Sequence, residues 1–321
     1  MEKIILFTDL HSEIIDNPQA RINQIKQAIL KEQPDYIINL GDFGYFCSTG
    51  EVSHPGKTMP INYNILNDEK TTKYKLLAEE LYNQLEKLDV PIYSVLGNHD
   101  MDFCTKQRAL EFYKLEQSYY HVETPTYILV FLDTNYFKNQ KGELQDYSQG
   151  NYYHEDNTYL TPEQLTWLRD LFTRYNKPFI LFSHAPLNDM PRGIKNHADL
   201  QKILLEAQNN GKKIVASLNG HLHIDVATEV HNITYVNVNS VSYHWMGTEN
   251  KYYNEQILTP EHPVLQYILR YEEPLFCTLV LEEQGIRIFG KASEYGIEKD
   301  TYLAQEKVIV PKISHRFIAM P

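Results

Sequence analysis

Leu96-Gly97-Asn98-His99-Asp100 closes a short apolar run over residues 91–96. A run with β-branched and aromatic residues that ends at a glycine predicts a buried strand whose last residues lie at a functional edge. The polar residues offer an amide oxygen, an imidazole that titrates near neutrality and a carboxylate. Taken alone, such a turn is more typical of polar residues that satisfy their own backbone. Its interpretation depends on the residues at the ends of the other strands.

Four further apolar runs end in the same kinds of side chain. We predict strands at residues 3–8, 36–40, 178–182 and 213–218, and the polar residues that come after them are Asp9 and His11, Asp42, His184, and His221 with His223. Parallel strands connected by helices bring their carboxyl ends to one edge, where α/β proteins bind ligands. Carboxylate, amide and imidazole groups gathered there are what two divalent cations need.

The order Asp-x-His, Gly-Asp, Gly-Asn-His-Asp, His, Gly-His-x-His resembles the calcineurin-like metallophosphoesterase family over about residues 1–225. Each dipeptide is common, but five in order, each after a strand, form a specific signal. The resemblance implies an α/β fold, a four-layer α/β/β/α sandwich with two central mixed sheets. We expect a catalytic core at residues 1–240 with insertions at about 43–72 and 136–159. Residues 241–321 would be a C-terminal extension or cap packed on the core.

The resemblance also implies a dinuclear metal centre. One metal would be held by Asp9, His11, Asp42 and His223, and the other by Asp42, Asn98, His184 and His221. A metal-bound hydroxide would attack phosphorus in line, since two ions sharing a carboxylate lower the pKa of bound water. His99 would protonate the leaving oxygen as general acid, with Asp100 holding its imidazole. Manganese, iron and zinc all suit these ligands.

The leading hypothesis is a metal-dependent phosphoesterase acting on a small phosphodiester, phosphoanhydride or phosphomonoester. A nucleotide-like substrate is favoured, because the motif set looks most like the branch with bacterial cyclic-nucleotide phosphodiesterases and nucleotide pyrophosphatases. The alternatives are a nuclease of the same fold and a non-catalytic metal-binding module. The net charge of −12 argues against a nucleic-acid partner, and the complete ligand set argues against the binding module.

Substrate contacts are less defined by the sequence. Arg192 could contact a phosphate oxygen or be a solvated loop charge, and Tyr45 could contact substrate or pack beside the site. Tyrosines in the loops could stack a base or simply pack the loops; the candidates are Tyr45, Tyr63, Tyr136, Tyr152, Tyr243 and Tyr252. Asp133 comes after a strand at residues 127–132, and we expect it to cap its own backbone.

Composition describes an ordinary globular chain of 321 residues, 42% hydrophobic and 22% charged. Three cysteines, Cys47, Cys104 and Cys277, argue against a secreted disulfide framework. We find no signal-peptide pattern and no apolar run of membrane-spanning length, so we expect a cytoplasmic location. The oligomeric state is not predicted.

Helices are predicted at residues 17–34, where Asn17-Pro18 is an N-cap signal, and at 74–88, 102–116 and 198–209. Thr161-Pro162-Glu163-Gln164 is a capping-box pattern that begins another helix. A strand is expected at 234–238, and a hairpin is expected to join 276–281 to 286–289. We expect this C-terminal third to extend the second sheet and to form a cap over the site. Residues from 298 onward are not assigned.

Overall fold

The computed structural model describes residues 1–12, 14–15, 17–44, 69–152, 157–246, 265, 267–296 and 309–321. Most of the first expected insertion therefore lies outside the described residues, as does much of the expected C-terminal cap. The tyrosines at 45, 63 and 252 and Cys47 also lie outside them.

Two six-stranded mixed sheets form the centre of the molecule, as predicted. The first has the order β16-β15-β14-β1-β2-β3, and its strands are β1 (Glu2–Phe7), β2 (Tyr36–Asn39), β3 (Ile92–Ser94), β14 (Cys277–Glu282), β15 (Gly285–Phe289) and β16 (Arg316–Ala319). The second has the order β10-β11-β9-β8-β5-β4, and its strands are β4 (Tyr120–Glu123), β5 (Ile128–Leu132), β8 (Phe179–Ser183), β9 (Ile214–Asn219), β10 (Val226–Val230) and β11 (Ile233–Asn237). Within them, β1, β2 and β3 are mutually parallel, as are β5, β8, β9 and β11.

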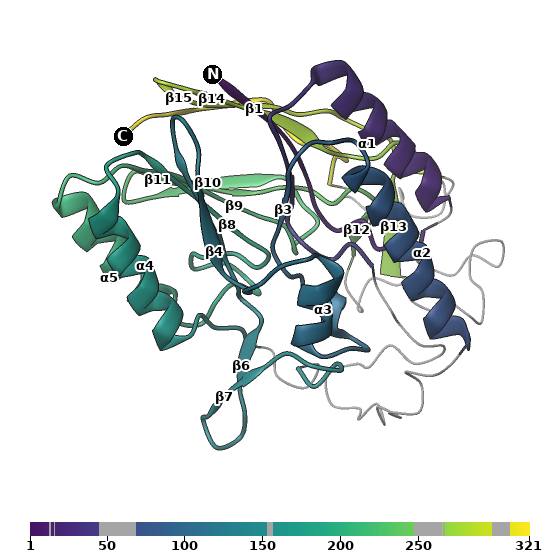
Figure 1. Cartoon of the computed structure of the whole chain (residues 1–321), viewed down its shortest axis with the longest axis horizontal. Helices are drawn as coiled ribbons and strands as arrows, with labels where there is room; N and C mark the ends of the chain where they lie inside the picture. The colour runs from purple at the N-terminus through teal and green to yellow at the C-terminus, as the bar shows by residue number, and fades with distance from the viewer. Residues whose placement is uncertain are drawn as a thin grey trace.

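Helices cover the outer faces of both sheets (Figure 1). They are α1 (Pro18–Glu32) and α2 (Glu69–Glu86) beside the first sheet, and α4 (Pro162–Arg174) and α5 (His197–Asn209) beside the second. A shorter helix, α3 (Lys106–Phe112), and a 3₁₀ turn, η2 (His99–Met101), come after β3. This is the expected four-layer arrangement. It requires both faces of a central strand to be apolar, and successive side chains of β5 point to opposite faces of the sheet. Ile128, Val130 and Leu132 pack toward α4 and α5, whereas Leu129 and Phe131 pack toward the first sheet.

Two of the predicted helix starts are formed by side-chain caps. Asn17 accepts a hydrogen bond from Ala20 N, and Pro18 occupies the first turn of α1. Thr161 accepts one from Gln164 N at the start of α4. In a full capping box the Gln164 side chain would also bond the backbone N–H of Thr161. Here the Gln164 amide instead accepts from Asp133 N and donates to the Asp133 carbonyl. That contact fastens α4 to the end of β5.

The C-terminal hairpin forms as predicted but joins the other sheet. β14 and β15 pair antiparallel around Glu282 and Gly285, and β14 pairs antiparallel with β1. The prediction that this hairpin extends the second sheet is therefore wrong, because the free edge of β1 accepts it. The unassigned C-terminus supplies β16, which pairs with β15. The N- and C-termini consequently lie near one another at one end of the first sheet (Figure 1).

Two short sheets complete the fold. β6 (Tyr136–Lys138) and β7 (Leu144–Asp146) form a hairpin in the second expected insertion, and it projects from the body of the molecule (Figure 1). β12 (Tyr243–Trp245) pairs with β13 (Ile268–Arg270). Within the parts of the chain that the structure describes, none of the helices combines the length and the apolar composition that crossing a membrane requires.

A buried ion pair connects α3 to the end of β5. Lys106 Nζ donates to Asp133 Oδ2 at 2.8 Å and to the Asn135 carbonyl at 2.8 Å, and both charged side chains are buried. Asp133 Oδ1 accepts from Asn135 N at 2.9 Å, which confirms the predicted self-capping role. Asn135 in turn donates to the Leu96 carbonyl at 2.7 Å. This network holds the turn after β3, which carries the central motif.

Replacing Lys106 by Met should lower the free energy of unfolding by about 3–5 kcal/mol, because it leaves the Asp133 carboxylate buried without a cation. Urea denaturation followed by circular dichroism measures the change. Lys202→Met is the matched control, since Lys202 is exposed and its pair with Asp199 should contribute about 0–1 kcal/mol. Equal losses of stability in the two variants would show that the buried pair has no special role.

Candidate metal centre

All seven predicted metal ligands lie just beyond the carboxyl ends of strands from the two sheets. β1 leads to Asp9 and His11, β2 to Asp42 and β3 to Asn98; β8 leads to His184, and β9 to His221 and His223. Each of these strands runs parallel to its neighbour in the sheet, so the turns after them meet at one edge. The structure thus brings together every residue of the predicted ligand set.

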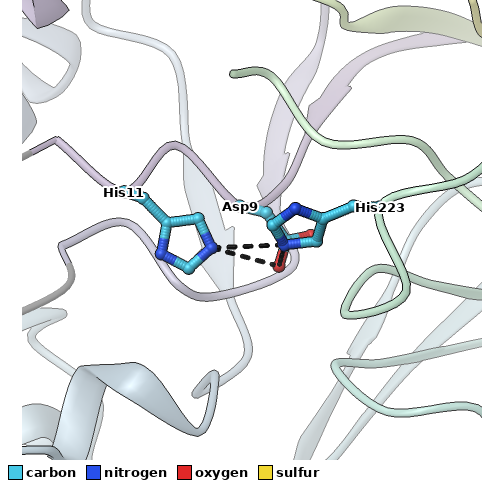
Figure 2. Close-up of side chains that lie close together, drawn as sticks. All are labelled: Asp9, His11 and His223. Atoms are coloured by element: carbon cyan, nitrogen blue, oxygen red, sulfur yellow. Dashed lines mark hydrogen bonds and ion pairs between the residues drawn. The ribbon is translucent and has the colours of Figure 1, made fainter. Parts of the chain in front are cut away.

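Asp9, His11 and His223 form the first group. Their ligand atoms lie within 4.8 Å of one another, and all three side chains are buried. His223 Nε2 lies 3.2 Å from Asp9 Oδ1 and 3.3 Å from His11 Nε2. Figure 2 shows both rings turned so that a nitrogen faces the carboxylate. This is the arrangement expected of three ligands around one cation.

Asp42, His184 and His221 form the second group, again with ligand atoms within 4.8 Å of one another. His184 Nε2 lies 3.1 Å from Asp42 Oδ2 and 3.2 Å from His221 Nδ1. Asn98 Oδ1 lies 3.0 Å from the same His184 nitrogen, so the amide oxygen joins this group.

The hydrogen-bond chemistry of the two groups fits bound metal ions. His184 Nδ1 lies 2.8 Å from the Leu40 carbonyl, which only accepts, so Nδ1 carries a hydrogen and Nε2 is the nitrogen left to hold a second proton or a metal ion. This Nε2 atom faces a carboxylate oxygen of Asp42 and the amide oxygen of Asn98. His223 repeats the pattern, with Nδ1 3.1 Å from the Tyr243 carbonyl and Nε2 facing Asp9. Buried acceptors that face one another need a cation between them, and a metal joins more of them than one proton does.

Asp42 lies between the two groups. Its Oδ2 is 3.1 Å from His184 Nε2 in the second group and 3.9 Å from His11 Nε2 in the first. Its other oxygen, Oδ1, accepts from the backbone N–H of His99 at 2.8 Å. One carboxylate oxygen is therefore in reach of both groups, which is the geometry that a bridging ligand requires.

Five of the seven predicted ligands have a left-handed backbone, which is uncommon for residues other than glycine. Their φ angles are 54° for Asp9, 47° for His11, 54° for Asp42, 70° for His221 and 52° for His223. Such conformations cost on the order of 1–3 kcal/mol each and persist where the surroundings enforce them. Backbone hydrogen bonds from Asp9 N to Gly41 O and from His11 N to Asp42 O hold the first two turns together.

Glycines next to the ligands allow the strand ends to approach closely. A Cβ on Gly97 would lie 2.1 Å from Asp42 Oδ1, and a Cβ on Gly220 would lie 2.1 Å from Thr8 Oγ1. Neither contact is sterically possible, so no other residue would let the turn carrying Asn98 lie against Asp42, or the turn carrying His221 lie against the end of β1. This explains why Gly precedes Asn-His-Asp and His-x-His in the sequence.

Electrostatics at the site favour cations. Burial alone would lower the pKa of His184, but the Asp42 carboxylate raises it to about 9. Burial lowers the pKa of His11 to about 3, so its ring is neutral at pH 7 and able to act as a ligand. Burial would raise the pKa of Asp42, yet the neighbouring histidines hold it well below its usual range.

His99 lies beside the first group, with its ring centroid 5.5 Å from that of His11, and its side chain is one quarter exposed. Burial opposes its protonation, but the Asp102 and Asp42 carboxylates raise the pKa of His99 to about 9. Its Nδ1 lies 2.9 Å from Asp102 Oδ2.

The prediction that Asp100 holds the His99 imidazole is therefore wrong. The Asp100 carboxylate accepts from three backbone N–H groups, Gly97 at 2.7 Å and Asp42 and Phe43 at 3.2 Å each, and thereby joins the two turns. The reason is local geometry, because η2 has three residues per turn and places residue 102, not 100, beside the side chain of 99.

Tyr152 is a site residue that the sequence did not single out for this role. Its hydroxyl donates to Asp102 Oδ1 and accepts from Asn98 Nδ2 at 3.2 Å. Burial and the Asp102 charge hold the pKa of this phenol well above its ordinary value, so it keeps its proton. Tyr152 lies in a tyrosine-rich insertion, where no sequence pattern distinguishes it from its neighbours. Asp102 could have been identified, because it is three residues after His99 and a 3₁₀ turn brings residues i and i+3 together.

The predicted substrate contacts divide into described and undescribed residues. Tyr45 lies outside the described residues. Arg192 is exposed and has a left-handed backbone, with φ 59°. Burial holds the pKa of His221 well below its usual value, and the charges of His184 and Arg192 lower it further, so Arg192 acts on the second group. Among the base-stacking candidates, Tyr152 and Tyr243 are buried, which favours the alternative that they pack the site.

Comparisons with known proteins agree with this geometry. No curated protein matches the chain at a significant level. The chain resembles the solved structure of a dimetal phosphatase from Danio rerio, with a TM-score of 0.61, 14% identity, and coverage of 90% of this chain and 95% of that chain. It also resembles GAP50, described as the anchor in the inner membrane complex of Plasmodium, with a TM-score of 0.54, 15% identity, and coverage of 100% and 89%.

A family model described as calcineurin-like phosphoesterase matches residues 2–225, which hold all seven predicted ligands and His99. The fold of two mixed sheets between helices and the two candidate ligand groups agree with that match. The chain belongs to the calcineurin-like phosphoesterase family and is a metal-dependent phosphoesterase.

Proposed function

We propose that this protein hydrolyses a small phosphodiester, phosphoanhydride or phosphomonoester, with a nucleotide-like substrate favoured. The observation that carries the proposal is the pair of ligand groups, in which every residue except the partly buried His221 is buried, with one Asp42 oxygen in reach of both groups and His99 beside them. The first metal would be held by Asp9, His11, Asp42 and His223, and the second by Asp42, Asn98, His184 and His221. When bound, two such ions activate water and neutralise charge on the phosphoryl group.

The protein residues around the ions orient the substrate and supply a proton. His99 would protonate the leaving oxygen from Nε2, because its Nδ1 is engaged by Asp102. Arg192 would contact a phosphate oxygen beside the second group, since its guanidinium is exposed and its charge acts on His221. The net charge of −12 provides no general attraction for phosphate, so the metals would supply most of the binding charge.

Two alternatives make different predictions. A nuclease of this fold would need a basic groove for a long polyanion, which the acidic composition disfavours. A non-catalytic module is the second alternative, because this chain shares its fold with a protein described as an anchor in the inner membrane complex of Plasmodium. The His99–Asp102 pair favours catalysis over that alternative, because neither residue is among the predicted metal ligands.

A hydrolysis panel tests the proposal directly. Metal-stripped protein is reloaded with manganese, iron or zinc and offered an aryl phosphodiester, an aryl phosphomonoester, a cyclic nucleotide and a nucleoside diphosphate sugar. We expect turnover of at least one substrate with a reloaded protein and none with the stripped protein, measured by release of nitrophenol or by phosphorus NMR. Metal-loaded protein that is inactive on all four would favour the binding module.

Asp42→Asn should reduce the bound metal from two ions to one or none, because a neutral amide cannot hold two cations together. Metal content after dialysis, measured by mass spectrometry, gives the stoichiometry. Asp199→Asn is the matched control, since Asp199 is exposed on α5 and should leave two ions bound. A variant at 42 that retains both ions would contradict the bridging assignment.

His99→Ala should lower kcat by about 10²–10⁴-fold, the usual contribution of a general acid, while both ions stay bound. The backbone N–H that bonds Asp42 is retained in this variant, so the ligand geometry should persist. Steady-state kinetics and metal analysis are compared with His315→Ala, an exposed histidine on the far C-terminal segment. Loss of both metals in the variant at 99 would assign that residue to the metal site instead.

A further inference from the structure

A continuous chain of hydrogen bonds runs from a predicted metal ligand to the predicted general acid. Asn98 Nδ2 donates to the Tyr152 hydroxyl at 3.2 Å, and that hydroxyl donates to Asp102 Oδ1. The other Asp102 oxygen lies 2.9 Å from His99 Nδ1. Asn98, Asp102 and Tyr152 are all buried.

The direction of every bond in this chain is determined by chemistry. The Asp102 carboxylate only accepts, so both the Tyr152 hydroxyl and His99 Nδ1 must donate to it. A hydroxyl that donates its one proton to Asp102 can only accept from Asn98, and Asn98 must therefore present its amino group to Tyr152. The Asn98 oxygen is then left facing His184 Nε2, 3.0 Å away, in the second ligand group.

Tyr152 is held firmly in this position by packing and backbone contacts. Its ring stacks on that of Tyr147 with centroids 4.2 Å apart and an interplanar angle of 7°. Gln149 N donates to the Cys104 carbonyl at 2.9 Å, and Gly150 N donates to the Met101 carbonyl at 3.1 Å. The segment that carries Tyr152 is thus fastened to the turn after His99.

We propose that Tyr152 is a positioning residue whose single hydroxyl sets two groups at once. It directs the Asn98 oxygen toward the second metal group, and it holds Asp102 so that Nε2 of His99 is presented to the leaving oxygen. The inference rests on the proposed function, and it makes the second insertion part of the active site. Neither Tyr152 nor Asp102 belongs to the five motifs.

The chemical consequence concerns the leaving group. As the bond from phosphorus to the leaving oxygen breaks, its electron pair stays on that oxygen, which takes the proton from His99 Nε2 and leaves the ring neutral. A leaving group such as 4-nitrophenolate is stable without that proton, whereas a phenolate or alkoxide is much less so. A misplaced His99 should therefore penalise poor leaving groups more than good ones.

The activity test compares methyl 4-nitrophenyl phosphate with methyl phenyl phosphate at saturating zinc or manganese. Tyr152→Phe keeps the stacked ring and removes the hydroxyl, and its fall in kcat should be about tenfold larger for the phenyl ester. Tyr147→Phe is the matched control, because it keeps the stack and removes a hydroxyl that bonds the Asn157 carbonyl instead. Asp102→Asn and the double variant complete a cycle, in which the two losses should not add.

A second measurement does not depend on turnover. The proton on His99 Nδ1, bonded to a buried carboxylate, should give a downfield imidazole resonance in the zinc-loaded protein, assigned by its loss in His99→Ala. Tyr152→Phe should shift or broaden this resonance, and Tyr147→Phe should leave it unchanged. Zinc titration should also show about tenfold weaker binding of one ion in Tyr152→Phe, since Asn98 loses the partner that orients it.

The outcomes separate this inference from the proposed function. Equal losses on both esters in Tyr152→Phe, or an unchanged His99 resonance, would overturn the positioning role even if the wild-type protein is an active hydrolase. A metal-loaded wild-type protein inactive on these two esters and on all four substrates of the hydrolysis panel would overturn the proposed function. In that case the resonance and the zinc affinity still decide whether Tyr152 positions His99 and Asn98.

Discussion

Buried acceptor atoms that face one another are the constraint on which this structure depends. Asp42 Oδ2 and Asn98 Oδ1 both lie within 3.1 Å of His184 Nε2, while the other ring nitrogen donates to the Leu40 carbonyl. Such an arrangement is costly without a cation, because desolvated acceptors repel one another. The surrounding fold holds these atoms together, and a proton or a metal ion between them offsets the repulsion.

The same constraint explains the unusual backbone at the strand ends. The residues just beyond β1, β2 and β9 have left-handed φ angles at Asp9, Asp42 and His221. From these turns the side chains meet partners that follow strands of the other sheet, Asp9 with His223 and Asp42 with His184. Close approach of the turns then excludes a side chain at Gly97 and at Gly220. The positions of the predicted ligands, the left-handed backbone and the two glycines therefore depend on one another.

Much of this could be predicted from the sequence, because it is local. Each ligand comes shortly after an apolar run, and the helix starts at Asn17 and Thr161 carry their own caps. The sheet to which β14 belongs could not be predicted, since pairing with β1 joins residues about 270 positions apart and no periodicity encodes it. The prediction that Asp100 is the partner of His99 was wrong for a more local reason. In a 3₁₀ turn, residue i lies beside residue i+3, so Asp102 is the neighbour of His99.

Tyr152 is the clearest example of a site residue that the motifs could not predict. The five motifs contain the groups that would bind metal and the imidazole that would give the proton, but not the groups that would orient them. Asp102 and Tyr152 fix the His99 ring and the Asn98 amide, and Tyr152 belongs to an insertion that also carries the projecting β6–β7 hairpin. Because a proton is transferred efficiently only when donor and acceptor are aligned, the proposed role of Tyr152 would make this insertion affect the chemistry as well as the surface. Two chains with identical motifs and different insertions would therefore differ in the leaving groups they can release.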